Sequence, residues 1–319
     1  MLKNFIAKQK QLEKIISKWK KTAKQNNLKV DYINTYTGHK NYTLTISNFK
    51  ISSKNKKALY IGQSHAHEPA TTAGMVDFIN QLLTGRDLNG RPTQLDVESI
   101  LSQMTITFNP IGNPDGRERA PVTYWDGSKY TNDQFWCWMR GEDPDNPGKM
   151  WLRLEEWDTR KIKHPKPIGV VYEQVSKYKY VEPNRSRLGS YYRLFMKMDK
   201  KYKYDRWLDL HQTEFVKRPD NCEILLPFTG LDKGKIKKEN IDWGKQIIAG
   251  WKKAGFKPKS EPYALGKCTN PNETYRGYLY RRMPIIATEV KNNAKDFPPE
   301  NQLKSNIIAI TETIKRMTR

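Results

Sequence analysis

The chain has 319 residues, of which 37% are hydrophobic and 29% are charged. This is enough apolar material for one large core, so a chain that is disordered throughout is excluded. Lysine and arginine number 57 against 34 aspartate and glutamate residues, which gives a net charge of +23. Such a charge favours anionic surfaces, but the lysines are spread along the chain and no nucleic-acid motif occurs. We therefore expect a lysine-rich, solvated surface and no nucleic-acid partner.

Membrane and disulfide signals are missing from the sequence. No segment reaches the roughly 18 apolar residues that a membrane span needs. Cys137, Cys222 and Cys268 have no close spacing and are odd in number, which indicates neither a disulfide framework nor a cysteine zinc site. The first residues lack the apolar core of a signal peptide. The sequence therefore predicts a cytoplasmic protein, or a secreted or cell-wall-associated one if a signal was removed.

Predicted helices and strands alternate along the chain. Apolar residues at helical spacing predict an N-terminal helix over about residues 1–25. Such a helix could lie on an anionic membrane, but we expect it to pack on its own domain. A hairpin is predicted over 29–49. The later strands are expected at 58–61, 105–108, 207–210, 224–227 and 284–288, and the later helices at 69–84, 97–104, 188–200, 239–254 and 299–315.

Residues 117–167 lack this alternation and are rich in tryptophan, aspartate, glycine and proline. A long segment with so many aromatic residues is expected to be an ordered loop over a site rather than a flexible linker. No internal repeat or linker-like segment occurs, so we expect a single domain over residues 1–319. Strands that alternate with helices predict an α/β fold with helices on both faces of the sheet.

Ionisable residues follow several of the predicted strands at their carboxyl ends. His65 and Glu68 follow the strand at 58–61, and His211 and Glu289 each follow a later one. Ligands bind at this edge of open α/β sheets. Two histidines and one glutamate suit a catalytic zinc ion, with one position left open for water. Glu289 could then act as the base for that water, whose pKa zinc lowers to about 7.

The motif His65-Ala66-His67-Glu68 offers two histidines. Adjacent residues of an extended segment point to opposite sides, so His67 is not expected to face the same ion as Glu68. His65 is therefore the predicted ligand, and His67 has no assigned role. A buried structural histidine at His211 and a surface acid at Glu289 are the alternatives, and the position of both residues after apolar strands disfavours them.

The order of these residues resembles the zinc metallocarboxypeptidases of the carboxypeptidase A type. The resemblance extends from about residue 28 to the C-terminus. The motifs that carry it are His65-x-x-Glu68, Asn113-Pro114-Asp115-Gly116, Asn184-Arg185, Asp209-Leu210-His211 and Glu289. It implies a three-layer α/β/α sandwich with a mixed, mostly eight-stranded sheet. It also implies one zinc ion per chain, bound by His65, Glu68 and His211.

The resemblance further implies roles for residues around the zinc ion. Glu289 matches the general base and proton shuttle. Asn184 and Arg185 match the pair that binds the terminal carboxylate of the substrate, for which the planar fork of arginine is suited. Glu182 matches an acid that hydrogen-bonds the first zinc histidine and fixes its tautomer.

Two family positions have several candidates. The arginine that polarises the scissile carbonyl is best matched by Arg140, which follows Trp138-Met139, but Arg117 and Arg119 also compete. The tyrosine that closes over the substrate is best matched in order by Tyr263, and Tyr275 is the alternative.

The function implied is that of a carboxypeptidase, a hydrolase that cuts the C-terminal peptide bond of a peptide with a free carboxylate. Residues within 265–276 are expected to form the floor of its specificity pocket. A cell-wall peptidase that cuts peptidoglycan stem peptides is the alternative; the net charge favours muropeptide substrates and the missing signal peptide opposes them. A non-catalytic cationic binding protein with a vestigial metal site is the alternative of another class, which the complete set of ligands and base opposes.

Overall fold

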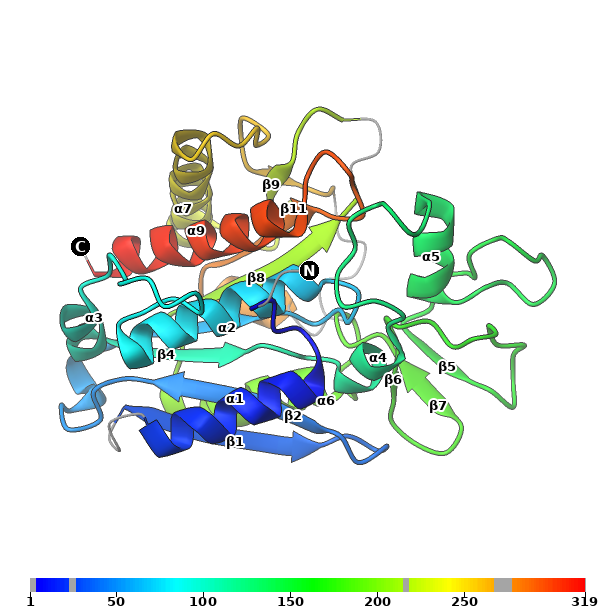
Figure 1. The fold of residues 1–319 in the computed structure, drawn as a ribbon, viewed down its shortest axis with the longest axis horizontal. Coiled ribbons are helices and arrows are strands. Elements are labelled where there is room, and N and C mark those ends of the chain that lie inside the picture. Colours follow the sequence, from blue (N-terminus) through cyan, green and yellow to red (C-terminus); the bar gives the residue numbers. More distant parts are fainter. Residues whose placement is uncertain (1–3, 23–26, 215–217, 267–276, 319) are drawn as a thin grey trace.

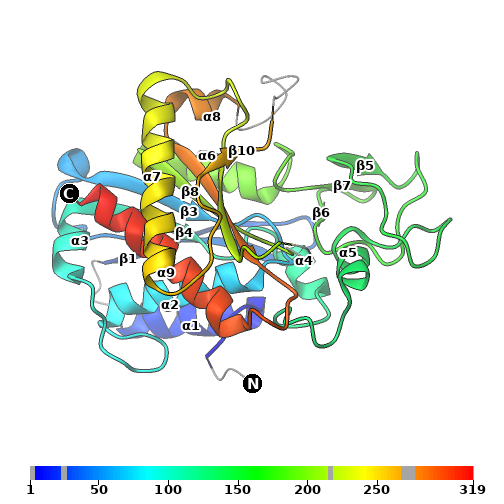
Figure 2. The same cartoon turned by 90° about the horizontal axis from the view of Figure 1, so that it is seen from above.

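The computed structural model describes residues 4–22, 27–214, 218–266 and 277–318. They form an α/β protein whose mixed eight-stranded sheet has helices on both faces, which confirms the predicted fold (Figure 1; Figure 2). The strands in order across the sheet are β1 (Leu28–Asn34), β2 (Lys40–Ile46), β4 (Met104–Asn109), β3 (Lys57–Gly62), β8 (Arg206–Thr213), β11 (Ile285–Lys291), β9 (Cys222–Leu226) and β10 (Tyr263–Ala264).

The strands β4, β3, β8 and β11 in the middle of the sheet are parallel. The strands β1, β2 and β9 join them by antiparallel pairing, and β10 runs parallel to β9. Because the middle strands are parallel, their carboxyl ends meet at one edge of the sheet, where ligands bind in such folds.

Two hydrophobic clusters cover the two faces. The larger one contains Leu59 and Ile61 of β3, and the other contains Ala58 and Tyr60, as the period of two of a strand requires. The helices of the larger cluster are α1 (Gln9–Thr22), α2 (Pro69–Thr84), α3 (Val97–Gln103), α7 (Gly234–Lys253) and α9 (Pro299–Met317). Those of the second cluster are α6 (Ser190–Tyr202) and α8 (Gly277–Arg282).

The N-terminal helix α1 packs on the larger cluster. Its apolar stripe, which includes Leu12, Ile16 and Trp19, is buried there, and Trp19 Nε1 donates to Asn80 Oδ1 of α2 at 3.0 Å. This burial removes the apolar face that a membrane-surface helix would need. In the part of the chain that the structure describes, no helix is long and apolar enough to cross a membrane.

A smaller lobe extends beyond the carboxyl edge of the main sheet (Figure 1). It holds a three-stranded sheet in the order β5 (Glu156–Asp158), β7 (Lys179–Val181), β6 (Glu173–Gln174), together with α4 (Pro114–Arg119) and α5 (Asn132–Arg140). The sequence analysis missed α5. The sequence feature that indicates this helix is the capping box of Thr131 and Gln134, whose side chains accept hydrogen bonds from N–H groups at the start of the helix. A short 3-10 turn, η1 (Ser53–Asn55), precedes β3.

The Asn113-Pro114-Asp115-Gly116 motif builds the start of α4. The Asn113 side chain accepts from Gly116 N at 2.9 Å and donates to Val171 O at 2.9 Å. Asp115 accepts hydrogen bonds from the Thr35 and Thr37 hydroxyls at 2.7 and 2.6 Å. The motif therefore ties the lobe to the main sheet.

A buried glutamate holds the start of α6. Gly189 offers no side-chain cap, and the Glu173 carboxyl group accepts instead from Ser190 N and Ser190 Oγ, at 2.9 and 3.0 Å. Burial raises the pKa of Glu173 to about 8, and the nearby charge of Asp115 adds to the rise. The native protein therefore binds this proton more tightly than the unfolded chain does.

Glu173→Gln should flatten the pH dependence of stability. The contribution of Glu173 is fully present below its ordinary pKa of 4.5 and is lost as the pH rises through about 8. The wild type should lose about 3 to 4 kcal/mol relative to the variant between about pH 5 and pH 8, since each pH unit between the two pKa values costs about 1.4 kcal/mol. Urea unfolding at both pH values measures this. Parallel losses of stability in the two proteins would contradict it.

Candidate metal centre

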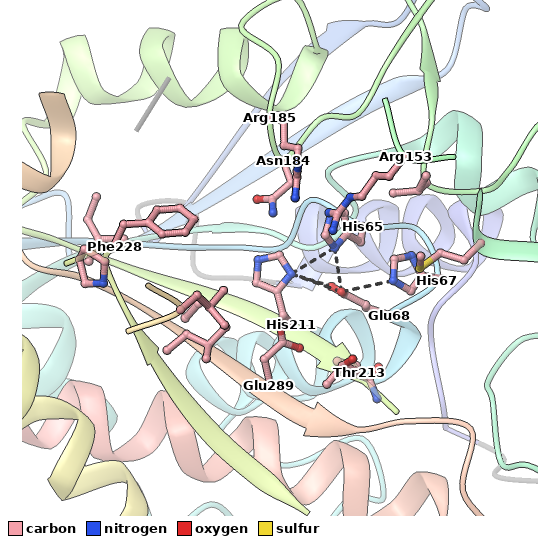
Figure 3. A pocket seen from close by; sticks show the side chains of 18 of the residues that line it. His65, His67, Glu68, Arg153, Asn184, Arg185, His211, Thr213, Phe228 and Glu289 are labelled. Carbon is pink, nitrogen blue, oxygen red and sulfur yellow. Dashed lines mark hydrogen bonds and ion pairs between the residues drawn. The ribbon is translucent and has the colours of Figure 1, made fainter. Parts of the chain in front are cut away.

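His65, Glu68 and His211 converge at the carboxyl ends of β3 and β8 (Figure 3). His65 Nδ1 lies 2.8 Å from Glu68 Oε1, and His211 Nδ1 lies 3.2 Å from Glu68 Oε2 and 3.3 Å from His65 Nδ1. All three residues are buried, and one ligand atom from each lies within 4.8 Å of the others. Two imidazoles and one carboxylate at this spacing fit a zinc ion that keeps one position open.

The other ring nitrogen of each histidine contacts a carboxylate. His65 Nε2 lies 3.2 Å from Glu182 Oε1, and His211 Nε2 lies 2.6 Å from Asp209 Oδ2. Carboxylates at these positions retain the proton on Nε2 and leave Nδ1 as the ligand atom of both rings. The sequence analysis assigned no role to Asp209. The sequence does indicate such a role, because Asp209 and His211 are two residues apart in a strand and therefore lie on the same face of β8.

The charges of the site are strongly coupled. Burial disfavours the Glu68 carboxylate, but His211 and His65 outweigh this effect and lower its pKa. Burial also disfavours the charged form of His211, yet Asp209 and Glu68 raise its pKa well above the ordinary value. Zinc binding must displace the proton from His211 Nδ1, so metal affinity should decrease in acid.

Glu289 lies on β11 directly beside His211 of β8. The strand continues to Lys291, so Glu289 lies inside it and not after its end as the sequence predicted. Its Oε2 atom is buried and has no hydrogen-bond partner among the described residues. Burial raises the pKa of Glu289 to about 8, and Glu68 contributes to the rise. A buried carboxyl group with such a pKa is suited to accept and release a proton near neutral pH.

A cavity of about 400 Å³ opens onto the triad and Glu289. Asn184, Arg185 and Arg153 line it on one side of the triad, and Glu289 lies on the other side (Figure 3). Apolar residues form a further wall: Leu225, Leu226, Pro227, Phe228, Ile285 and Ala287. The cavity therefore joins the metal-binding atoms, a cationic patch and an apolar surface. Leu265 also lines it, and residues 267–276 of the expected specificity segment lie outside the described residues.

The arginines proposed from the sequence lie elsewhere. The Arg140 guanidinium packs over the Trp136 ring at 5.2 Å, and the described lining of the cavity does not include Arg140. Arg117 is buried with Nη2 3.3 Å from Thr72 Oγ1, and Arg119 donates to the carbonyl groups of Gly169 and Tyr172. These contacts hold the Arg117 and Arg119 side chains within the protein, away from the described cavity lining.

Arg153 reaches the cavity instead. Its Nε atom donates to Glu182 Oε2 at 2.8 Å, and its Nη2 atom donates to Glu182 Oε1. The sequence analysis missed it, although Trp151-Leu152-Arg153 repeats the spacing of Trp138-Met139-Arg140. Only the path of the lobe distinguishes the two arginines.

Tyr263 contacts a buried glutamate next to the cavity. Its hydroxyl donates to Glu223 Oε1 at 2.7 Å, and the described cavity lining does not include it. Tyr275 lies outside the described residues. Tyr280, to which the sequence analysis gave no role, lines the cavity.

The fold and the site define an α/β protein with a buried His-Glu-His metal centre at the carboxyl edge of its sheet. A family model described as zinc carboxypeptidase matches residues 15–200, more than half of the chain, and the chain belongs to that family. The match includes His65, Glu68 and Glu182 but ends before His211 and Glu289, which the fold brings to the same place.

Solved structures share the fold at low sequence identity. A metallo-carboxypeptidase from Burkholderia cenocepacia is 12% identical with a TM-score of 0.59, over 96% of this chain and 68% of that one. Carboxypeptidase A from Helicoverpa armigera is 10% identical with a TM-score of 0.59, over 98% and 73%. Bovine thrombin-activatable fibrinolysis inhibitor is 13% identical with a TM-score of 0.57, over 97% and 96%. No curated protein matches the sequence.

Proposed function

We propose that this protein is a zinc-dependent carboxypeptidase that hydrolyses the C-terminal peptide bond of peptides. The observation that carries the proposal is the composition of one cavity, which is lined by the His65-Glu68-His211 triad, Glu289 and Arg185. Family membership supports a hydrolase acting on peptides.

Arg185 and Asn184 bind the substrate carboxylate in this proposal. The Arg185 side chain is 41% exposed, and its contacts with Glu155 and Glu182 are long, at 3.8 and 3.5 Å. A substrate carboxylate that forms two short hydrogen bonds with the guanidinium would compete favourably with such contacts. The neighbouring Asn184 amide supplies a further donor to the cavity.

Glu289 moves the proton. When bound, zinc supplies Lewis-acid chemistry and lowers the pKa of water at the open position. Glu289 accepts the proton of the attacking water and then donates it to the leaving amine, for which its raised pKa is suited. Arg153 places a positive charge beside the triad, and we assign it the stabilisation of charge that develops on the scissile carbonyl oxygen.

A peptidase assay with matched substrates tests the function. The zinc-loaded protein should release the last residue from peptides with a free C-terminus, spare the same peptides with an amidated C-terminus, and lose activity with a chelator until zinc is restored. Equal cleavage of both substrate forms would reject a carboxypeptidase. A protein that binds zinc but hydrolyses neither peptides nor muropeptides would support the vestigial binding protein instead.

Arg185→Ala should raise KM for free-acid peptides by about 100-fold, because a charge-assisted bidentate contact contributes about 1.5–3 kcal/mol. Zinc affinity should not change. Arg187→Ala is the matched control, since Arg187 is exposed on the same loop outside the described cavity lining. Steady-state kinetics of both variants measure the effect, and an unchanged KM in Arg185→Ala would contradict the assignment.

A further inference from the structure

A buried tyrosine contacts the carboxylate that holds His211. Tyr191 belongs to α6, and its hydroxyl donates to Asp209 Oδ1 at 3.1 Å, while Asp209 Oδ2 lies 2.6 Å from His211 Nε2. Tyr191 and Asp209 are both fully buried. The three side chains therefore form a continuous chain of contacts from helix α6 to a zinc ligand.

Two glycines lie against Tyr191, and their lack of side chains makes room for its ring and hydroxyl group. A Cβ atom at Gly62, the last residue of β3, would come within 2.5 Å of the Tyr191 hydroxyl oxygen. A Cβ atom at Gly112 would come within 2.6 Å of the Tyr191 ring. Real Cβ atoms do not approach other atoms so closely, so a side chain at either position would clash with Tyr191, and at Gly112 also with the Gln63 carbonyl oxygen at 2.1 Å. The backbone is thus shaped to admit this tyrosine beneath the sheet edge.

We infer that Tyr191 is a positioning residue that acts through Asp209 to fix His211 for zinc binding. The carboxylate of Asp209 has two oxygens, and the donor on Oδ1 orients the group so that Oδ2 receives His211 Nε2–H. This leaves the lone pair of Nδ1 for the ion. Without the hydroxyl, a buried carboxylate oxygen loses a donor, and Asp209 would rotate to recover one.

The arrangement mirrors the contacts of the other histidine. His65 Nε2 contacts Glu182, whose two oxygens accept from Arg153. Each ligand histidine thus has a carboxylate that a second donor holds in place. The donor for His65 comes from the lobe, whereas the donor for His211 comes from α6, which follows the loop that carries Asn184 and Arg185.

The inference rests on the proposed zinc site, so zinc affinity is the measurement. Tyr191→Phe should raise the zinc dissociation constant about 5-fold, and Asp209→Asn about 10- to 100-fold, as for other outer carboxylates of zinc histidines. Competition with a chromogenic chelator measures both constants. The melting temperature of the zinc-free proteins reports whether each variant folds.

Tyr192→Phe is the matched control. It removes a hydroxyl from the next residue of α6, which bonds to Tyr278. Its zinc affinity should stay within about twofold of wild type. In the Asp209→Asn background, Tyr191→Phe should raise the zinc dissociation constant by a further factor of less than about two. The effects of two residues that act through the same contact are not additive.

The outcomes separate the two proposals. Absence of zinc binding by the wild type would overturn the proposed function and this inference with it. Zinc binding by the wild type with an equal affinity in Tyr191→Phe would overturn the inference alone. If Tyr191→Phe does not fold, Asp209→Asn decides, and an unchanged affinity in that variant would overturn the role of the Tyr191-Asp209 contact.

Discussion

Glu289→Gln is expected to lower kcat by about 10³-fold while the zinc affinity stays within about threefold of wild type. Removal of a general base costs roughly 10²- to 10⁴-fold in rate, and we expect the upper part of this range because one group both takes and returns the proton. The amide has nearly the same size as the carboxyl group, so packing on β11 should not change. The candidate metal ligands are His65, Glu68 and His211 and do not include Glu289, so metal binding should persist.

The matched control for this prediction is Glu223→Gln. Glu223 lies directly opposite Glu289 on the neighbouring strand β9 and is also buried. Its carboxylate is held by Arg218 at 2.9 Å and by the Tyr263 hydroxyl at 2.7 Å, outside the described cavity lining. The same substitution there should leave kcat within about threefold when each protein is measured at its own optimum pH, because the Glu223 charge contributes to the raised pKa of Glu289. Single-turnover kinetics of both zinc-loaded variants measure this, and near-normal turnover by Glu289→Gln would reject Glu289 as the base.

His211→Ala should weaken zinc binding by more than about 100-fold and abolish detectable hydrolysis. Loss of an outer carboxylate costs 10- to 100-fold in zinc affinity, and loss of a ligand should cost more. The variant also leaves Asp209 without its partner at 2.6 Å, in a position with no exposure to solvent. Zinc content after dialysis against a weak chelator measures the effect.

His67→Ala is the control that distinguishes the histidines of the first motif. The His67 ring stacks on His65 at 5.0 Å, but its nearest carboxylate contact, Nε2 to Glu68 Oε1, is 3.5 Å long. The metal-binding group contains His65 and not His67. Zinc affinity should therefore stay within about threefold in His67→Ala. Wild-type zinc affinity in His211→Ala, or a loss in His67→Ala as large as in His211→Ala, would contradict the ligand assignment.

Several parts of the fold follow from local sequence patterns. The helix over 69–84 has its apolar spacing, a proline at its first turn and a glycine after its end, and α2 has these bounds with Gly85 at a φ of 71°. The parallel strands in the middle of the sheet are short, continuous apolar runs. Such runs are typical of strands that helices cover on both faces. By contrast, α5 depends on its capping box and on burial of Phe135 and Met139, within a segment that lacks the regular alternation of the rest of the chain.

The sequence by itself determined which residues form the candidate centre: His65 and Glu68 follow an apolar strand, His211 and Glu289 lie near the carboxyl ends of two others, and parallel strands bring such positions to one edge. Only the tertiary structure decided which groups surround them. Arg153 and Arg140 have the same local context, and the path of the lobe brings Arg153 alone of the two to the described cavity lining. The residues that surround the centre are set by contacts between segments far apart in the chain. Local periodicity carries no information about such contacts, because they depend on how the lobe and the helices pack against the edge of the sheet.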